Sequence, residues 1–436
     1  MRIGVFGHYG NANMGDEAIV QATLESLRRR IPGAELACFT INKADSEQRH
    51  GVPSYPIRRL AKELGAFEMV GEPERPVGQF QYQAPKPPEH TSGIRSALKK
   101  IPLLGGFVRA ARLFVEGLQN LPSEVAFLYR NYRLLKQFDL LMVTGSNQFL
   151  DNFGGLWGFP YTVLKWAVIA RLAGCKLALV SLGAGPLTGS WSKRFCRWSL
   201  GLAAHASYRD FPSRELIEGS GPDYKGKVYP DVATNIDLPP RVPRGEGAKL
   251  RVGINPMPVY DSRYWHASDD NLYAAYIDKL VALVRHVIAR GHAPCLFSTQ
   301  IQDNNVIGDV LSQLTPEEDQ LVTVRQPRSV DALLDVLANL DISVPTRFHG
   351  SVLSLRTGLP TLGICYHRKI GDLLTDVGLG DFQVTFEEFT IERISGLLDR
   401  LVEERAEAEQ TIAGATARYL AALDQQYDEL AALVGH

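Results

Sequence analysis

The feature that most constrains the fold is a regular alternation of short apolar runs with segments of helical periodicity, repeated in both halves of the chain. The apolar runs are continuous, which is typical of strands in a parallel sheet covered by helices on both faces. The pattern therefore predicts an α/β fold. The expected strands are Ile3–Phe6, Leu36–Thr40, Leu140–Thr144, Leu177–Leu182, Ala206–Arg209 and Val228–Tyr229 in the first half, and Leu250–Asn255, Cys295–Ser298, Leu321–Val324, Ile342–Val344, Thr361–Cys365 and Gln383–Phe386 in the second.

The boundary between the halves is a proline-rich, charged stretch at Leu238–Lys249. Because 436 residues exceed the size of one ordinary core, we expect two Rossmann-like domains, residues 1–237 and 250–390. Ligands of open parallel sheets bind at the carboxyl ends of the strands, so a cleft between the domains is expected. Residues 391–436 predict a long helix that can cross back to the first domain.

An insert at about 60–136 departs from this alternation. Residues 73–88 are polar and rich in proline, and residues 94–136 are basic and amphipathic. Two interpretations fit the insert. It is either a surface for an anionic membrane or a lipid-linked acceptor, or a pair of helices that pack on the first domain with solvated charges.

Composition excludes several classes of partner. The chain is 45% apolar and 22% charged with a formal charge of −1, so we expect no nucleic-acid partner. The five cysteines form no CxxC pair and no apolar run is long enough to span a bilayer, which favours a cytoplasmic protein, at the inner membrane face if the insert binds lipid. No group of Cys, His and carboxylates has metal-site spacing, and we expect neither a metal nor a cofactor.

The strongest candidate for a reaction centre follows the strand that ends at Pro345. Thr346, Arg347, Phe348, His349 and Gly350 come next, and a helix is expected to begin near Ser351. A guanidinium and an imidazole beside free backbone N–H groups would combine anion affinity with proton transfer. The alternative is that Arg347 pairs with a nearby carboxylate and that His349 is a half-buried structural histidine.

Polar and small residues also follow the strands of the first domain. The loop from Gly7 to Asp16 is rich in Gly and Asn but lacks the GxGxxG spacing of a dinucleotide site. Gly145–Asn147 and Gly183–Pro186 follow two further strands, and Arg209 ends a third. Because these strand ends share one edge of the sheet, they predict a second half of the same site.

An ordered set of motifs resembles the polysaccharide pyruvyl transferases. The motifs are Asn13-Met14-Gly15-Asp16-Glu17-Ala18-Ile19, Gly183-Ala184-Gly185-Pro186, Tyr208-Arg209-Asp210, Pro230-Asp231-Val232-Ala233, Arg347-Phe348-His349-Gly350, Gly358-Leu359-Pro360 and Tyr366-His367-Arg368-Lys369. The resemblance implies a GT-B-like fold, phosphoenolpyruvate as co-substrate, and a pyruvate ketal formed on a sugar of an exopolysaccharide, a cell-wall polysaccharide or a lipid-linked precursor. At Gly145–Gln148 the chain lacks the family's run of glycines, which indicates a different acceptor pocket.

Ketal formation from an enol phosphate requires proton transfer and fixed positive charge for a carboxylate and a phosphate. We assign proton transfer to His349, assisted by Arg347. The expected donor-binding residues are Arg209, Arg347, Gly350, Ser351, Lys369 and His367. The expected acceptor-binding residues are His8, Asn11, Asn13, Gly15, Asp16, Ser146 and Asn147.

Two other functions fit the same fold. A GT-B glycosyltransferase would use a nucleotide sugar and typically grip its ribose with a carboxylate, whereas the segment after Val344 offers Arg347, His349 and Arg356. A non-catalytic glycan-binding protein would keep the cleft and tolerate loss of His349.

Overall fold

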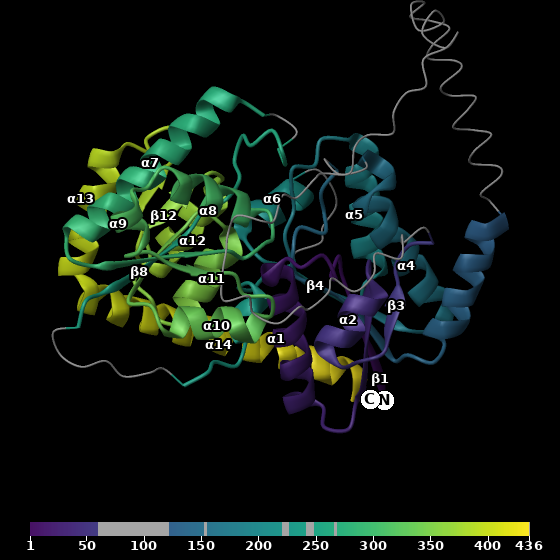
Figure 1. Cartoon of the computed structure of the whole chain (residues 1–436). Helices are drawn as coiled ribbons and strands as arrows, with labels where there is room; N and C mark the ends of the chain where they lie inside the picture. The colour runs from purple at the N-terminus through teal and green to yellow at the C-terminus, as the bar shows by residue number, and fades with distance from the viewer. Residues whose placement is uncertain (60–121, 152–154, 220–225, 241–247, 266–267, 436) are drawn as a thin grey trace, which may run out of the picture.

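The computed structural model describes the chain except residues 60–121, 152–154, 220–225, 241–247, 266–267 and 436. The proline-rich segment 73–88 and the basic residues 94–121 of the insert therefore lie outside the described residues. Two α/β units lie side by side, and the chain termini lie close together on the first (Figure 1). No helix among the described residues has the length and apolarity to cross a membrane.

The first domain contains a seven-stranded parallel sheet in the order β3-β2-β1-β4-β5-β6-β7. Alternate residues of β1 face opposite cores: Ile3 and Val5 pack with helices α1 and α14, and Phe6 packs with α4. All six predicted strands form. The edge strand β3 was not predicted, because three residues that end in Pro56 give too short a pattern.

The elements of this domain are β1 Arg2–Phe6, α1 Met14–Arg30, β2 Glu35–Thr40, α2 Lys43–His50, β3 Ser54–Pro56, β4 Leu140–Thr144, η3 Gly155–Trp157, α4 Phe159–Ala173, β5 Lys176–Leu182, α5 Ser190–Leu202, β6 His205–Tyr208, α6 Phe211–Glu218, β7 Lys227–Val228 and η4 Val232–Asn235. A helix over residues 122–135 also belongs to the insert and packs on α4, where the ring centroids of Phe127 and Trp166 are 6.4 Å apart. This part of the insert packs on the domain, as the second interpretation expects.

The second domain differs from the expected single run of strands. Four parallel strands pair in the order β10-β9-β8-β11, and β12 and β13 form a separate pair. The two sheets touch through one bridge between Ser343 and Thr361, because Pro360 has no amide hydrogen to extend the ladder. The elements are β8 Arg251–Asn255, α7 Asp270–Ala289, β9 Ala293–Phe297, α8 Asp303–Ser312, α9 Pro316–Asp319, β10 Thr323–Arg325, α10 Val330–Ala338, β11 Ile342–Pro345, α11 Phe348–Arg356, β12 Gly363–Cys365, α12 Arg368–Val377 and β13 Gln383–Thr385.

The C-terminal segment is two helices rather than the single one expected. Helix α13, Ile391–Glu403, ends before Glu404, and α14, Arg405–Val434, passes from the second domain to the first (Figure 1). There the buried Gln426 accepts a hydrogen bond from Ser181 Oγ at 3.1 Å and donates one to Ser207 Oγ at 2.6 Å. These bonds tie the end of the chain to β5 and β6.

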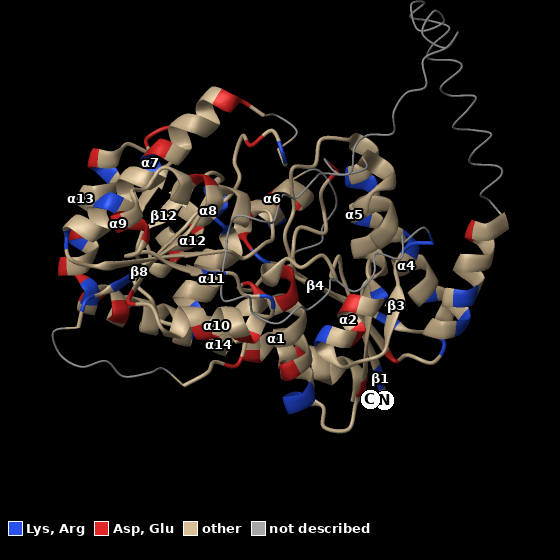
Figure 2. Ribbon diagram, viewed as in Figure 1, with Lys and Arg blue, Asp and Glu red and all other residues tan. Residues whose placement is uncertain are grey.

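Direct contacts bring the carboxyl ends of the two sheets together. The backbone N–H of Met14 donates to the carbonyl of Thr299 at 3.0 Å, and the Arg356 side chain donates to the carbonyl of Ile236 at 2.9 Å. The loops that follow β1, β4, β6 and β11 therefore face one interdomain region. Helices α4 and α5 lie on one face of the first sheet, and these two helices contain Lys and Arg but no Asp or Glu (Figure 2).

Candidate functional site

Two cations, one from each domain, share a single amide oxygen at the interdomain edge. Arg209 follows β6 and donates from Nη2 to Oδ1 of Asn147 at 3.0 Å, and Lys369 donates from Nζ to the same oxygen at 2.8 Å. Burial and the Arg209 guanidinium lower the pKa of Lys369 to about 7. An ammonium and a guanidinium held this close leave positive charge available for an anion.

The backbone beside this pair must be glycine. A Cβ at Gly183 would lie 2.4 Å from Oδ1 of Asn147 and 2.8 Å from Nη2 of Arg209. The small-residue turn after β5 thus has a physical explanation, because any side chain there would separate Asn147 from Arg209. Arg209 also lies over the Phe348 ring, with its guanidinium carbon 4.5 Å from the ring centroid.

His349 lies between carboxylates of the first domain. Its Nε2 is 3.6 Å from Oδ2 of Asp231, which also accepts a hydrogen bond from Arg209 at 3.2 Å. Although burial opposes ionisation, the His349 imidazole and the Arg209 guanidinium hold the pKa of Asp231 well below its usual range. Asp231 belongs to the Pro230-Asp231-Val232-Ala233 motif, to which the sequence analysis assigns no role. In the structure it contacts both His349 and Arg209.

The first turn of α1 lies on the other side of His349. A Cβ at Gly15 would lie 2.3 Å from Nδ1 of His349, so the ring packs directly on this backbone. Burial raises the pKa of Asp16, opposed by His349 and by a hydrogen bond from Ser146. The pKa values of two carboxylates thus move in opposite directions around one imidazole, an arrangement suited to proton transfer.

Arg347 pairs with a nearby carboxylate, which is the alternative given for it in the sequence analysis. Its Nε donates to Oδ1 of Asp303 at 3.0 Å, and Nη2 contacts the same oxygen. Asp303 is fully buried and also accepts the backbone N–H of Thr299 at 3.0 Å. Arg347 therefore braces the loop between β9 and α8, and its assignment as a ligand of the donor stays a prediction.

The start of α11 corrects one expectation. The helix begins at Phe348 rather than near Ser351, and the N–H of Ser351 donates to the carbonyl of Arg347 at 2.9 Å. Its hydroxyl donates to the same carbonyl at 3.1 Å. Both groups thus have partners within the helix, and the expectation that Ser351 supports a phosphate stays a prediction. Gly350, one residue earlier, lies in the first turn, where backbone N–H groups have no helical acceptor.

His8 has both ring nitrogens engaged. Nδ1 contacts Oε1 of Gln148 at 2.8 Å, and Nε2 faces Nη2 of Arg58 at 3.5 Å. Since a guanidinium can only donate, Nε2 is the acceptor and Nδ1 carries the hydrogen. Burial, with Arg58, lowers the pKa of His8 to about 3. The neutral ring orders the loop after β1 and is unsuited to proton transfer near neutral pH.

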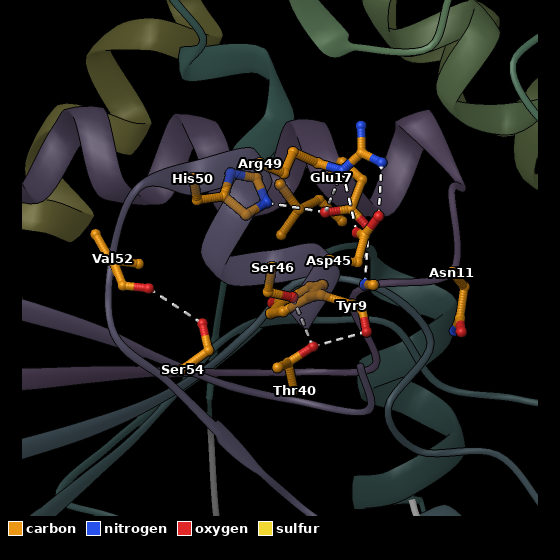
Figure 3. A network of polar contacts seen from close by, with 12 residues as sticks. Tyr9, Asn11, Glu17, Thr40, Asp45, Ser46, Arg49, His50, Val52 and Ser54 are labelled. Carbon is orange, nitrogen blue, oxygen red and sulfur yellow. Dashed lines mark hydrogen bonds and ion pairs between the residues drawn. The ribbon is translucent and has the colours of Figure 1, made fainter. Parts of the chain in front are cut away.

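A buried polar network holds the same loop from behind (Figure 3). The N–H of Gly10 donates to Oε1 of Glu17 at 2.8 Å, and Oε2 of Glu17 contacts Nε2 of His50 at 2.9 Å. Arg49 pairs with Asp45 at 3.0 Å. Sequence reasoning had passed over this network, because its members belong to separate helices, α1 and α2. It fixes the backbone that carries Asn11 and Asn13.

The remaining candidates fall at the edge of the site. Asn13 caps α1 by accepting the N–H of Gly15 at 3.1 Å and donates to Asp16 at 2.8 Å. Asn11 is exposed, and its amide donates to the carbonyl of His8 at 3.3 Å. His367 is exposed and caps α12 by accepting the N–H of Lys369 at 3.4 Å. The described residues contain no cluster of three His, Cys, Asp or Glu suited to a metal.

Comparison with known proteins agrees with the motifs. A model of the polysaccharide pyruvyl transferase family matches residues 13–368. The amylovoran biosynthesis protein AmsJ of Erwinia amylovora is 21% identical over 292 residues, which cover 62% of this chain and 68% of AmsJ. HepE of Anabaena, solved with UDP and glucose, has a TM-score of 0.51 at 11% identity over 99% of both chains. A putative UDP-N-acetylglucosamine 2-epimerase of Listeria monocytogenes has a TM-score of 0.52 at 10% identity, covering 98% of this chain and 97% of its own.

The solved structures confirm the predicted GT-B-like fold class, and at this level of identity they show the fold alone. The family match is more specific, because it spans most of the chain and includes Asp16, Arg209 and His349. The chain therefore belongs to the polysaccharide pyruvyl transferase family, which comprises transferases that act on polysaccharides.

Proposed function

We propose that this protein transfers the pyruvyl group of phosphoenolpyruvate to two hydroxyls of a saccharide, forming a cyclic ketal and releasing inorganic phosphate. The observation that carries the proposal is the cation pair Arg209 and Lys369, joined by Asn147, beside the His349–Asp231 contact. A compact three-carbon dianion matches this arrangement, since its carboxylate and phosphate both require cationic donors.

The chemistry assigns a task to each group. A proton is added to the methylene carbon of the donor, and an acceptor hydroxyl bonds to the neighbouring carbon as it loses its own proton. Phosphate then leaves, and a second hydroxyl closes the ring with loss of another proton. In this proposal His349 delivers the first proton, and Asp16 accepts the proton of the hydroxyl. Asp231, held ionised, orients the His349 ring through their contact.

The acceptor side is built by the first domain. Asn11 and Asn13 present amides in the loop after β1, and Ser146 contacts Asp16. A saccharide, free or linked to a lipid, would place its hydroxyl pair between Asp16 and His349. The structure solved with UDP and glucose shares only the fold with this chain. A nucleotide sugar is therefore tested as an alternative donor.

The direct test measures phosphate released from phosphoenolpyruvate in the presence of candidate saccharides or lipid-linked saccharides, with product mass as the second readout. His349→Ala should lower turnover by about 100-fold or more. His292→Ala is the matched control, because His292 precedes β9 at the opposite, amino edge of the second sheet. Turnover of a nucleotide sugar, or saccharide binding without any turnover, would refute the proposal.

A further inference from the structure

The outer surface of α4 and α5 exposes several large apolar side chains. Trp157, just before α4, is 70% exposed, and Leu172 near its end is also 70% exposed. On α5, Trp191 and Trp198 are 52% and 51% exposed. Tryptophan is normally among the more buried residues, so three exposed indoles on neighbouring elements need an explanation.

The exposed side chains of α5 form one continuous stripe. Trp191, Arg194, Phe195 and Trp198 follow the i, i+3, i+4, i+7 spacing of a single helical face. The opposite face, which includes Cys196, is buried against the sheet. The Trp191 and Trp198 rings are 6.5 Å apart, and Arg194 lies 4.8 Å from the Trp191 ring centroid. Packing on the sheet is thus complete without this stripe.

The charged residues of helices α4 and α5 themselves are all cations. From residue 152 to residue 209 the sequence contains no Asp or Glu (Figure 2). In that span Lys165 pairs with Glu124 and Arg209 is buried in the interdomain site, so the other cations of α4 and α5 are Arg171, Lys193, Arg194 and Arg197. The chain as a whole has a formal charge of −1, so the positive charge is local. A surface that combines tryptophan with Lys and Arg, and to which α4 and α5 contribute no carboxylate, complements an anionic lipid headgroup layer.

We propose that the outer face of α4 and α5, which we call the Trp–Arg face, docks on an anionic bilayer surface. The indoles would enter the headgroup layer, where Trp is favoured, and the arginines and lysines would contact lipid phosphates. Trp and Arg are also enriched at protein interfaces, and the absence of Asp and Glu from α4 and α5 is what favours an anionic lipid surface. Each cation near such a surface strengthens binding about five-fold.

The position of this face gives the docking a consequence. Helix α4 follows β4 and α5 follows β5, so Trp157 and Trp191 lie at the helix ends nearest the carboxyl edge of the sheet. Ser146 and Gly183 lie at the same edge, beside the acceptor side of the site. Docking would therefore bring the cleft close to the membrane. Access to a lipid-linked saccharide rests on the proposed function, whereas docking itself does not.

The test is co-sedimentation with vesicles of neutral phosphatidylcholine alone or with a quarter of anionic phosphatidylglycerol. The wild-type chain should bind only the anionic vesicles, and less at higher salt. The double variant Arg194→Glu with Trp198→Ser should bind at least ten-fold more weakly. The matched control is Arg325→Glu with Leu321→Ser, which removes one exposed arginine and one exposed apolar residue from the second domain.

Thermal unfolding checks that the variants are folded, and Arg194→Glu alone, a surface change, should show a smaller loss in the same direction. Absence of wild-type binding to anionic vesicles, or equal binding by the double variant, would overturn the proposal. So would a wild-type dimer that the double variant converts to monomer without any effect of lipid. Phosphate release with a soluble saccharide is measured separately, so vesicle binding without that activity would refute the proposed function and leave the docking intact.

Discussion

Asn147 offers the sharpest test of the cation pair, because a single amide oxygen accepts from both domains. Asn147→Leu keeps the size of the side chain and removes that acceptor. A hydrogen bond to a charged group contributes about 1.5–3 kcal/mol when buried. Arg209 is 7% exposed and should lose an amount in this range, whereas Lys369 is half-buried and water can replace its partner. We therefore expect a loss of about 2–4 kcal/mol in the free energy of unfolding.

Asn147→Asp is the informative partner of that variant. The carboxylate keeps both hydrogen bonds and adds a negative charge between Arg209 and Lys369, so the free energy of unfolding should not fall. Both variants should weaken binding of the proposed donor, the leucine by misplacing the cations and the aspartate by neutralising them. A loss of about 1.4 kcal/mol corresponds to a ten-fold weaker affinity, and we expect at least that in each.

The assays are urea unfolding and titration with phosphoenolpyruvate, run on the same preparations. We expect that Asn147→Leu lowers the free energy of unfolding and Asn147→Asp does not, whereas both variants bind the donor more weakly. If Asn147→Asp bound the donor as tightly as the wild type, the cations would not be serving a dianion. If Asn147→Leu were as stable as the wild type, the shared oxygen would not be holding the domains' cations in place.

Three further predictions follow from the site. Because the pKa of Lys369 falls from 10.5 to about 7 on folding, the unfolded chain binds more protons between those two pH values. The free energy of unfolding should therefore rise with pH across that window. Urea unfolding at several pH values measures this dependence, which should be weaker in Lys369→Met. Gly15→Ala, which would place a Cβ 2.3 Å from Nδ1 of His349, should lower kcat more than ten-fold with little change in the circular dichroism spectrum. Asp303→Asn should leave Arg347 buried without its carboxylate and lower stability by about 3–5 kcal/mol; a thermal unfolding curve unchanged from wild type would contradict that pairing.

Local pattern predicted the scaffold well because parallel strands buried on both faces read as continuous apolar runs. All of the expected strands of the first sheet form, and the unexpected β3 is three residues long. The pattern did not show that β12 and β13 stand apart from the other strands, because this depends on a single bridge at Thr361. Nor did it show the break at Glu404, where neither glycine nor proline marks the helix end.

The site shows a different limit. Arg347 and His349 lie two residues apart, yet the first pairs with Asp303 and the second with Asp231, in different domains. Because they are close in sequence, we expected both to act at one reaction centre, whereas the structure pairs each with a different carboxylate. Sequence position also separated Asn147 and Lys369 into acceptor and donor groups. These two residues are 222 positions apart and share a hydrogen bond, which only the docking of the domains creates.

The charges around the cleft suit an anion bound between the two domains, in addition to the contacts that the domains make with each other. Arg209 and His349 both draw on Asp231, so one buried carboxylate serves two basic groups. Lys369 adds a further cation whose hydrogen-bond partner in the site is a neutral amide, and burial together with repulsion from the Arg209 guanidinium lowers its pKa. An anion bound there would relieve that repulsion, raise the pKa of Lys369 and tighten the contact between the domains. A ligand that binds only this arrangement of the two domains would therefore stabilise it by its differential affinity.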